Sequence, residues 1–250
     1  MNCVPKVLTI CLASLLALGA TAGCKVTSCD SPAVDGGKPV TKGNCIEFEP
    51  TEQYTGNVRT VTQAWSSGKN VVVTNGNGDL KIFSDGATAE VRVDGTPFTR
   101  DGMSTAEAND AYARLAARPD PAVATDSAGN VTIDAPGSGF DGYRLNVHLP
   151  SGFDGTTSAT NGNGTIEYHA TPSTSGNSLH TSNGDINAFI GAGAKIMATG
   201  KTDLGIVVFR GAWTSPTVSA DQTSGSAQLG DGSGSVNATT GLGDVVFELQ

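Results

Sequence analysis

The chain contains few aromatic residues, few basic residues and only three histidines. Aromatic side chains make up 6% of the 250 residues, which is low for a carbohydrate cleft built from stacked rings. Acidic side chains outnumber basic ones by 24 to 15. Nucleic acids and anionic lipid surfaces are bound by basic patches, so the sequence excludes nucleic acid as a partner.

Motifs that carry catalysis are also absent, since the chain has no Gly-x-Ser-x-Gly, no His-Glu-x-x-His and no P-loop. Asp221, Asp231 and Asp244 fall in separate predicted turns, without the paired carboxylates that glycoside cleavage needs. His169 and His180 flank one connection and can be drawn together across neighbouring strands, although exposed histidines beside a loop are the simpler interpretation. We therefore predict no catalytic residue and no enzymatic activity.

Calcium is the metal to consider, because Asp and Asn recur at the predicted turns. The calcium-binding nonapeptide pattern is absent, and the phrase "NGNGD" supplies one carboxylate per turn, which is too few for a calcium cage. We predict a fold with no metal site and no cofactor.

The N-terminus has the pattern of a secretory signal. Lys6 precedes a largely apolar run of 12 residues, Val7 to Leu18, which is shorter than the about 20 residues of a membrane span. Small residues follow and lead to Cys24, and "TAGC" resembles the bacterial lipobox apart from Thr21, where that motif usually has Leu. We predict a signal peptide over residues 1–23 and a lipidated Cys24; cleavage after "ATA" at 20–22 is the alternative.

Two further cysteines, Cys29 and Cys45, remain in the predicted mature chain. An even pair in an oxidising compartment indicates a disulfide, which would close a loop of about 15 residues and contribute about 3 kcal/mol. Two free thiols are the alternative. Residues 24–50 are rich in Pro, Gly, Ser and Thr, and we expect them to form a lipid-anchored stalk that contains this disulfide.

A short phrase recurs along the rest of the chain, as "TNGNGDLKIF", "TNGNGTIEYH" and "TSNGDINAFI". We take as the reference position of each copy the glycine that precedes the Asp-Ile pair; in one copy a threonine stands there. The reference positions are Gly78, Gly129, Gly164, Gly184, Thr202, Gly225 and Gly243. The last four intervals are 20, 18, 23 and 18 residues, a period typical of stacked repeats.

Apolar residues keep fixed distances from these seven positions. They stand five before (Val73, Ala124, Ala159, Leu179, Met197, Ala220, Ala238), two after (Leu80, Val131, Ile166, Ile186, Leu204, Ala227, Val245) and four after (Ile82, Ile133, Tyr168, Ala188, Ile206, Leu229, Phe247). The +2 and +4 spacing is that of a strand with one buried face. Each repeat therefore reads as strand, Asn-Gly turn and strand, and an Asp or Asn at +1 can accept backbone N–H bonds.

We predict an all-β domain over residues 51–250, a β-solenoid or β-roll of about 20-residue coils, with an antiparallel β-sandwich as the alternative. One short helix is inserted at 104–117, where Ser104 and Glu107 form a capping box and Pro119 ends the pattern. Ala108, Ala111, Tyr112 and Leu115 form its apolar stripe.

The lipobox, the strand "YRLNVHLP" at 143–150 and the serial "TNGNGTI" and "TSNGDI" phrases resemble the bacterial putative-adhesin domain, a domain of unknown function with Asn-Gly-Asp-Ile repeats. The resemblance covers about residues 65–250. It implies an extracytoplasmic, mostly β protein with a β-helical fold, and it supplies no catalytic residues.

We therefore expect a lipid-anchored, non-catalytic protein of the cell envelope, with the outer membrane favoured over the inner one. It would act as an adhesin-like interaction module that contacts a surface polymer or an envelope protein through a sheet face or through the ladder of turns. Residues such as Glu167, Asn187 and Gln228 would line the sheet face. The alternatives are a structural or sensing component without its own ligand, a carbohydrate-active β-helix enzyme, and a secreted or periplasmic location.

Overall fold

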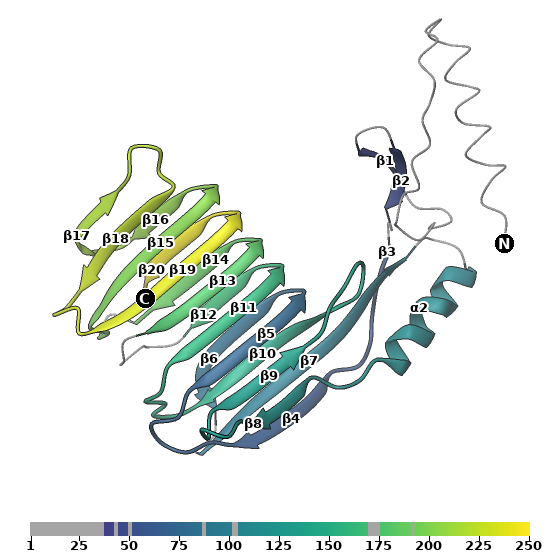
Figure 1. The fold of residues 1–250 in the computed structure, drawn as a ribbon, viewed down its shortest axis with the longest axis horizontal. Coiled ribbons are helices and arrows are strands. Elements are labelled where there is room, and N and C mark those ends of the chain that lie inside the picture. Colours follow the sequence, from purple (N-terminus) through teal and green to yellow (C-terminus); the bar gives the residue numbers. More distant parts are fainter. Residues whose placement is uncertain are drawn as a thin grey trace, which may run out of the picture. The chain divides into compact units, whose positions relative to one another are not determined.

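A computed structural model describes residues 38–42, 45–49, 52–86, 89–101, 105–169, 176–191 and 193–250. The chain divides into two compact units, one made of residues 1–54 and 100–114 and the other of residues 55–99 and 115–250. Figure 1 shows the larger unit as rows of strands in two layers. The prediction of an all-β fold is confirmed.

The smaller unit contains a hairpin and most of the helix. β1 (Lys38–Lys42) and β2 (Cys45–Glu49) pair antiparallel, within the stretch for which a stalk was predicted. The helix α2 (Thr105–Ala117) confirms the predicted insertion. Its expected apolar stripe is broken, because Tyr112 is 56% exposed and its ring packs edge-on against Tyr54, with centroids 5.4 Å apart.

The larger unit uses one strand–turn–strand arrangement five times, and the turn carries the chain from one sheet to the other. The strand pairs are β5 (Val71–Asn77) with β6 (Leu80–Gly86), β11 (Thr157–Asn163) with β12 (Ile166–His169), β13 (Asn177–Asn183) with β14 (Ile186–Ile190), β15 (Ile196–Leu204) with β16 (Val207–Arg210), and β19 (Gly234–Leu242) with β20 (Val245–Leu249). Their turn glycines are Gly78, Gly164, Gly184, Gly205 and Gly243, with φ between 108° and 151°. An L-residue rarely adopts such angles, which explains why glycine recurs at this point of the phrase.

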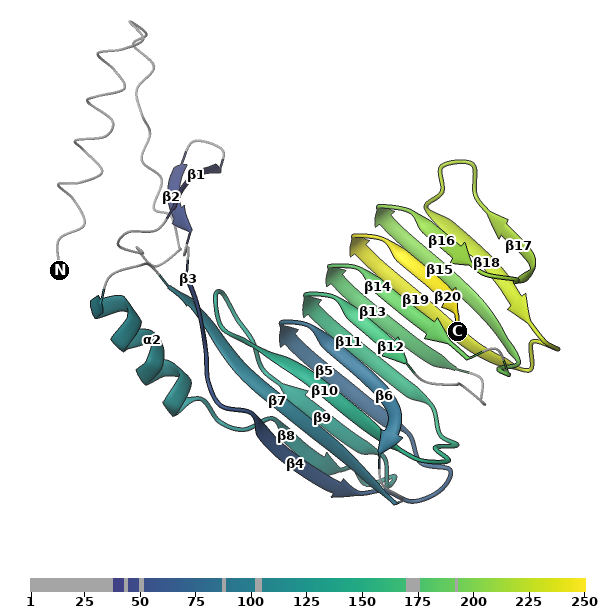
Figure 2. The ribbon, with the colours of Figure 1, turned by 180° about the vertical axis from the view of Figure 1, so that it is seen from behind.

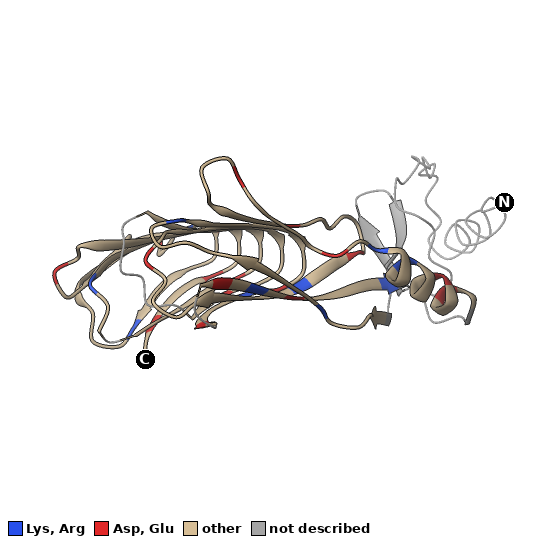
Figure 3. Cartoon of the chain, turned by 90° about the horizontal axis from the view of Figure 1, so that it is seen from below, with Lys and Arg blue, Asp and Glu red and all other residues tan. Residues whose placement is uncertain are grey.

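Eight further strands are described, and all but the first, which lies almost wholly in the smaller unit, complete the two layers of the larger unit. They are β3 (Glu52–Thr55), β4 (Arg59–Ala64), β7 (Glu90–Asp101), β8 (Ala122–Thr125), β9 (Val131–Ala135), β10 (Gly142–Pro150), β17 (Thr214–Val218) and β18 (Ser224–Leu229). In the larger unit, the first sheet runs β16-β20-β14-β12-β6-β10-β7, with β4 also beside β7, and the second runs β17-β18-β15-β19-β13-β11-β5-β9-β8. Figure 3 shows the two layers edge on.

The central strands pair in parallel, from β9 to β15 in the second sheet and from β10 to β16 in the first. Antiparallel pairs occur at the ends, where β7, β8, β17 and β18 lie. Two facing sheets agree with the sandwich alternative, but parallel central strands differ from its antiparallel pairing.

The strand pairs do not follow one another in chain order. β19 and β20 lie between the β13–β14 and β15–β16 pairs, although they come last in the sequence. In the same way, β5 and β6 lie between β9–β10 and β11–β12 (Figures 1 and 2). The last pair of the chain therefore fills a place that a simple sequential stack would give to β15 and β16.

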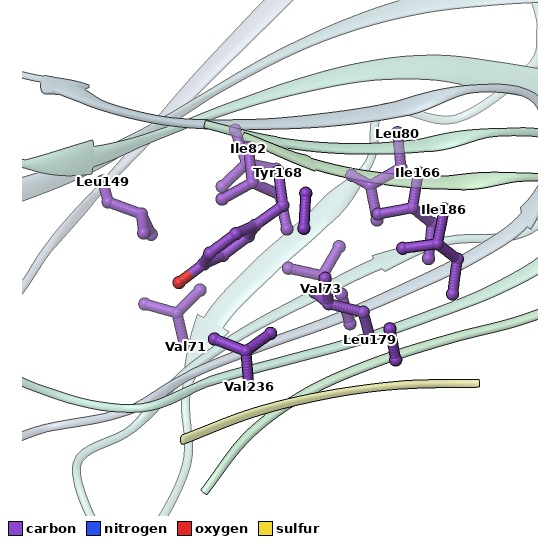
Figure 4. Packing of buried hydrophobic residues seen from close by; sticks show 14 of the residues in the cluster. Val71, Val73, Leu80, Ile82, Leu149, Ile166, Tyr168, Leu179, Ile186 and Val236 are labelled. Carbon is purple, nitrogen blue, oxygen red and sulfur yellow. The ribbon is translucent and has the colours of Figure 1, made fainter. Parts of the chain in front are cut away.

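The apolar core lies between the two sheets, and its register follows the predicted alternation. In the pairs that turn at Gly78, Gly164, Gly184 and Gly243, all twelve predicted core positions are buried. Ile186 is 0% exposed, and Asn187, the next residue, points to the opposite side of its strand. Figure 4 shows Tyr168 among aliphatic side chains such as Val71 and Ile82. Burial raises the pKa of the Tyr168 hydroxyl far above its usual range.

The alignment at Thr202 is wrong by three residues. Thr202 lies inside β15, and the turn glycine of this pair is Gly205, stacked on Gly243. Leu204 and Ile206 were predicted to be buried but are 68% and 39% exposed, and Met197 is 38% exposed. In this copy of the phrase Asp203 comes before the turn glycine, Gly205, whereas in the other copies with an aspartate that residue follows the glycine. Alignment on the aspartate therefore displaced the predicted buried positions by an odd number of residues, onto the outer face of the strand.

The positions at Gly129 and Gly225 are not turns between the sheets. Gly129 turns an antiparallel hairpin, β8 to β9, within the second sheet, and Ala124 in β8 is therefore exposed. Gly225 lies inside β18, antiparallel to β15; its neighbour at +2, Ala227, is buried, whereas Ala220 is exposed. Both segments have the residue types of the repeated phrase, but their strands pair antiparallel within the second sheet and do not cross to the first.

Candidate binding surface

The polar residues of the repeated phrase hold the strand pairs to one another. The Asn161 amide donates to the backbone carbonyl of Gly164 at 2.9 Å and to that of Gly78 at 3.0 Å. At +1, Asp79 accepts from the Thr165 N–H and Asp185 accepts from the Asp244 N–H, at 3.1 and 2.8 Å. The +1 aspartates accept backbone N–H bonds as expected, but the donors belong to the adjacent strand pair.

A column of asparagines adds side-chain contacts along the same edge. The Asn163 amide donates to Asn77 Oδ1 at 2.8 Å, and the Asn183 amide donates to Asn163 Oδ1 at 2.7 Å. These amide and carboxylate oxygens are occupied in stacking the units. The turn ladder therefore has a structural role, and its groups are poor candidates for a ligand site.

The predicted histidine pair is not formed, because His169 lies in the first sheet and His180 in the second. His169 instead belongs to a stack of rings on the outer face of the first sheet. The centroid distances are 5.4 Å from His148 to Phe83, 5.1 Å from Phe83 to His169, and 4.4 Å from His169 to Phe189. Sequence reasoning missed this stack, although Phe83, His169 and Phe189 all stand five residues after a turn glycine.

The ring stack is closed to sugars along most of its length. Adjacent planes are within 23° of parallel, so the rings cover one another's faces and present their edges outward. Binding of a sugar by stacking needs an open ring face. This arrangement therefore stabilises the sheet through cross-strand ring pairs.

Charged groups around the ring stack pair with one another. The nitrogens of His148 lie 2.7 Å from Asp85 and 3.4 Å from Asp94, and Lys81 Nζ lies 2.9 Å from Glu167. The pKa of the Glu167 carboxyl is lowered overall. Burial by itself would raise this pKa, but the hydrogen bonds from Lys81 and His169 stabilise the charged form and outweigh the effect of burial. These charged groups around the ring stack are thus paired with one another.

The outer face of the second sheet has a different chemistry. Strand register aligns two rows of side chains across it, Thr74, Thr160, His180, Thr239 and Lys201 in one row and Val72, Ser158, Ser178, Asn237 and Thr199 in the other. We call these ten residues the hydroxyl face. Neighbouring strands lie about 4.8 Å apart, so each row repeats its polar groups at that spacing.

The polar groups of the hydroxyl face have no partner in the described part of the protein. None of its nine polar side chains forms a hydrogen bond or an ion pair there. All are exposed except Ser158, which is partly exposed. A hydroxyl offers one donor and two acceptor positions, so the face presents a dense, regular array of unused hydrogen-bonding groups.

The residues predicted to line one face are divided between two. Glu167 and Asn187 are neighbours on the first sheet, and Gln228 lies in β18 of the second. Asp221, Asp231 and Asp244 lie in separate turns, where they bind Ser219, Ser233 and the Ile206 N–H, respectively. Among the described residues, no three His, Cys, Asp or Glu side chains are grouped so that they can hold a metal ion.

The predicted lipidation and disulfide cannot be placed on this surface. Cys24 and Cys29 lie outside the described residues, and of Cys45 only the backbone, in β2, is described. No described helix is long and apolar enough to cross a membrane.

No protein-family model and no curated protein sequence matches this chain. A "putative cell adhesion protein" from Clostridium sporogenes has a similar structure, with a TM-score of 0.47, 12% identity, and coverage of 78% of this chain and 100% of that one. A "putative adhesin" from Bacteroides fragilis has a TM-score of 0.22 and 8% identity, with coverage of 76% and 97%. Similarity at this level does not establish a family or a function for the chain.

Proposed function

We propose that the protein is a lipid-anchored, non-catalytic, adhesin-like module of the cell envelope, which binds a hydroxylated polymer on the hydroxyl face. The observation that carries this proposal is the contrast between the two outer faces. Around its ring stack the first sheet pairs charged groups with one another, whereas the nine polar side chains of the hydroxyl face have no partner in the described part of the protein.

The chemistry of the face indicates the class of ligand. Its two rows contain hydroxyl, amide and imidazole groups and a single charge, that of Lys201. Repeating hydroxyl groups of a polysaccharide can exchange hydrogen bonds with such rows. Each bond contributes only about 0.5–1.5 kcal/mol, so useful affinity requires many contacts along one polymer.

The proposed architecture suits this task. We propose that the five strand pairs form a β-roll in which each pair is one repeat. Stacking then sets both rows at constant spacing, which a polymer with its own repeat can follow. An N-terminal lipid at Cys24 would tether the protein to the membrane, with the outer membrane favoured.

The test removes hydroxyl groups without changing shape. Thr74→Val, Thr160→Val and Thr239→Val, combined, keep β-branched side chains on the row. The matched control is Thr62→Val, an exposed threonine of β4 on the first sheet. Binding of the purified mature protein to a panel of envelope and host-matrix polysaccharides is measured by co-sedimentation.

We expect the triple variant to lose about tenfold or more in affinity, and the control to bind like the original protein. Equal binding by all three proteins would overturn the role of the hydroxyl face. Capture of one envelope protein from intact cells, with no polysaccharide bound, would favour a structural or sensing component instead.

A further inference from the structure

The hydroxyl face ends in a shallow groove at β15, β17 and β18. The groove has a volume of about 520 Å³, and its walls include Thr199, Lys201, Thr217, Ser219, Ser224 and Ser226. Small-ligand sites commonly have volumes of about 300–1,000 Å³, so one saccharide unit fits this space.

Local backbone geometry accounts for the groove. The pairing of β17 with β18 shifts register between Thr214 and Thr217, and such an irregularity increases strand twist. Gly200 and Gly225 pair across β15 and β18 and face the core, where Val207 and Phe209 lie close against them. The twisted hairpin borders the groove beside β15, at the end of the sheet where Figure 1 shows β17 and β18.

The groove contains hydroxyl groups and one positive charge. Lys201 is exposed and forms no ion pair in the described part of the chain. No carboxylate is among the lining residues, but Asp221 lies beside them and accepts a hydrogen bond from the Ser219 hydroxyl at 2.6 Å. Thr217 and Ser226 share a hydrogen bond of 3.0 Å, and each hydroxyl keeps further capacity. An unpaired ammonium beside hydroxyl groups is complementary to an anion that itself carries hydroxyls.

The groove is continuous with the hydroxyl face. Lys201 pairs in register with Thr239 on one side and with Ser224 on the other. Thr199 likewise stands between Asn237 and Ser226. A polymer lying along the two rows would therefore reach the groove with one of its terminal units.

We propose that this groove binds a carboxylate-bearing saccharide unit, whose carboxylate pairs with the Lys201 ammonium. This inference rests on the proposed function, because it assigns an acidic unit to the polymer held on the hydroxyl face. The hydroxyl rows would bind neutral and acidic polymers alike, and the groove would distinguish between them.

The experiment compares oligosaccharides that differ only in the carboxylate. Oligomers of galacturonate, alginate and hyaluronan are each titrated into the full mature protein by calorimetry, beside the same oligomer with its carboxylates reduced to alcohols. The variants are Lys201→Gln, Lys201→Arg and a control, Lys195→Gln, whose side chain is 65% exposed and pairs with Asp231.

For at least one oligomer, we expect the acidic form to bind about tenfold or more tightly than its reduced form. Lys201→Gln should remove this preference while leaving affinity for the reduced form unchanged, Lys201→Arg should retain most of it, and Lys195→Gln should retain all of it. Added salt should weaken the preference, because the ammonium is exposed.

Two results overturn the inference and can be told apart. If each acidic oligomer binds no more tightly than its reduced form, or if Lys201→Gln keeps the preference, the groove assignment is wrong and the hydroxyl face is unaffected. If no oligomer of either form binds, both the groove assignment and the proposed function fail.

Discussion

Asp79 Oδ1 accepts a hydrogen bond from the Thr165 backbone N–H at 3.1 Å, although 86 positions separate the two residues. The same contact recurs farther along the stack, where Asp244 accepts from the Ile206 N–H at 2.9 Å. The aspartate that follows a turn glycine thus binds the backbone of the adjacent strand pair and helps to hold that pair in place. This contact explains why the Asn-Gly-Asp phrase is repeated.

Ile186→Ala and Asn187→Ala test the strand register. Ile186 is 0% exposed in the core, so its truncation should lower the free energy of unfolding by about 2–5 kcal/mol. Asn187 points outward, so its truncation should change stability by about 0.5 kcal/mol or less. Urea denaturation of both variants measures the difference. A larger loss for Asn187→Ala would contradict the register.

Gly184→Ala tests the turn column. Gly184 has a φ of 142°, and a Cβ there would lie 2.2 Å from the Gly164 carbonyl oxygen. Backbone strain and this clash should together cost about 1–3 kcal/mol or more. Gly193→Ala is the control, since a Cβ at Gly193 meets no atom within 4 Å and should cost about 0.5 kcal/mol or less. Equal thermal midpoints for the two variants would argue against a tightly stacked turn.

Acid should weaken the Lys81–Glu167 pair. The pKa of Glu167 is lowered in the folded protein from its ordinary value of 4.5, so its contribution to stability is fully present above about pH 4.5. That contribution is lost as pH falls through the lower folded-state pKa. A double-mutant cycle with Lys81→Gln and Glu167→Gln should show coupling at pH 7 that vanishes well below pH 4. Coupling that persists in acid would mean that the contact is not ionic.

Cys24→Ser tests the lipid anchor. The sequence "TAGC" after a short apolar run predicts that the mature chain begins at an acylated Cys24. Fractionation of cells should find the original protein with membranes and the variant in the soluble fraction. The lipobox interpretation fails if the variant stays with the membranes.

Thiol labelling tests the Cys29–Cys45 disulfide. Mass spectrometry of the mature protein, alkylated without reduction, should find neither cysteine labelled. Prior reduction should make both available and is the control. Labelling of both cysteines before reduction would show that they are free thiols.

The sequence by itself determined the local unit of the fold. Asn and Gly specify the turn, and apolar residues at alternate positions specify which side of each strand is buried. Both signals lie within about ten residues, so they placed Leu80, Ile166, Ile186 and Val245 in the core without further information. Where the order of Asp and Gly changes, at Asp203 and Gly205, the same reasoning put Leu204 on the wrong face.

The tertiary structure decided which strand pairs become neighbours. Every central strand presents similar backbone donors and acceptors at its edges, so local sequence does not show that β19 lies between β13 and β15. The ring stack from His148 to Phe189 and the two rows of the hydroxyl face follow from that order. The strands carry their side chains in known directions, but only long-range pairing arranges those side chains into a surface.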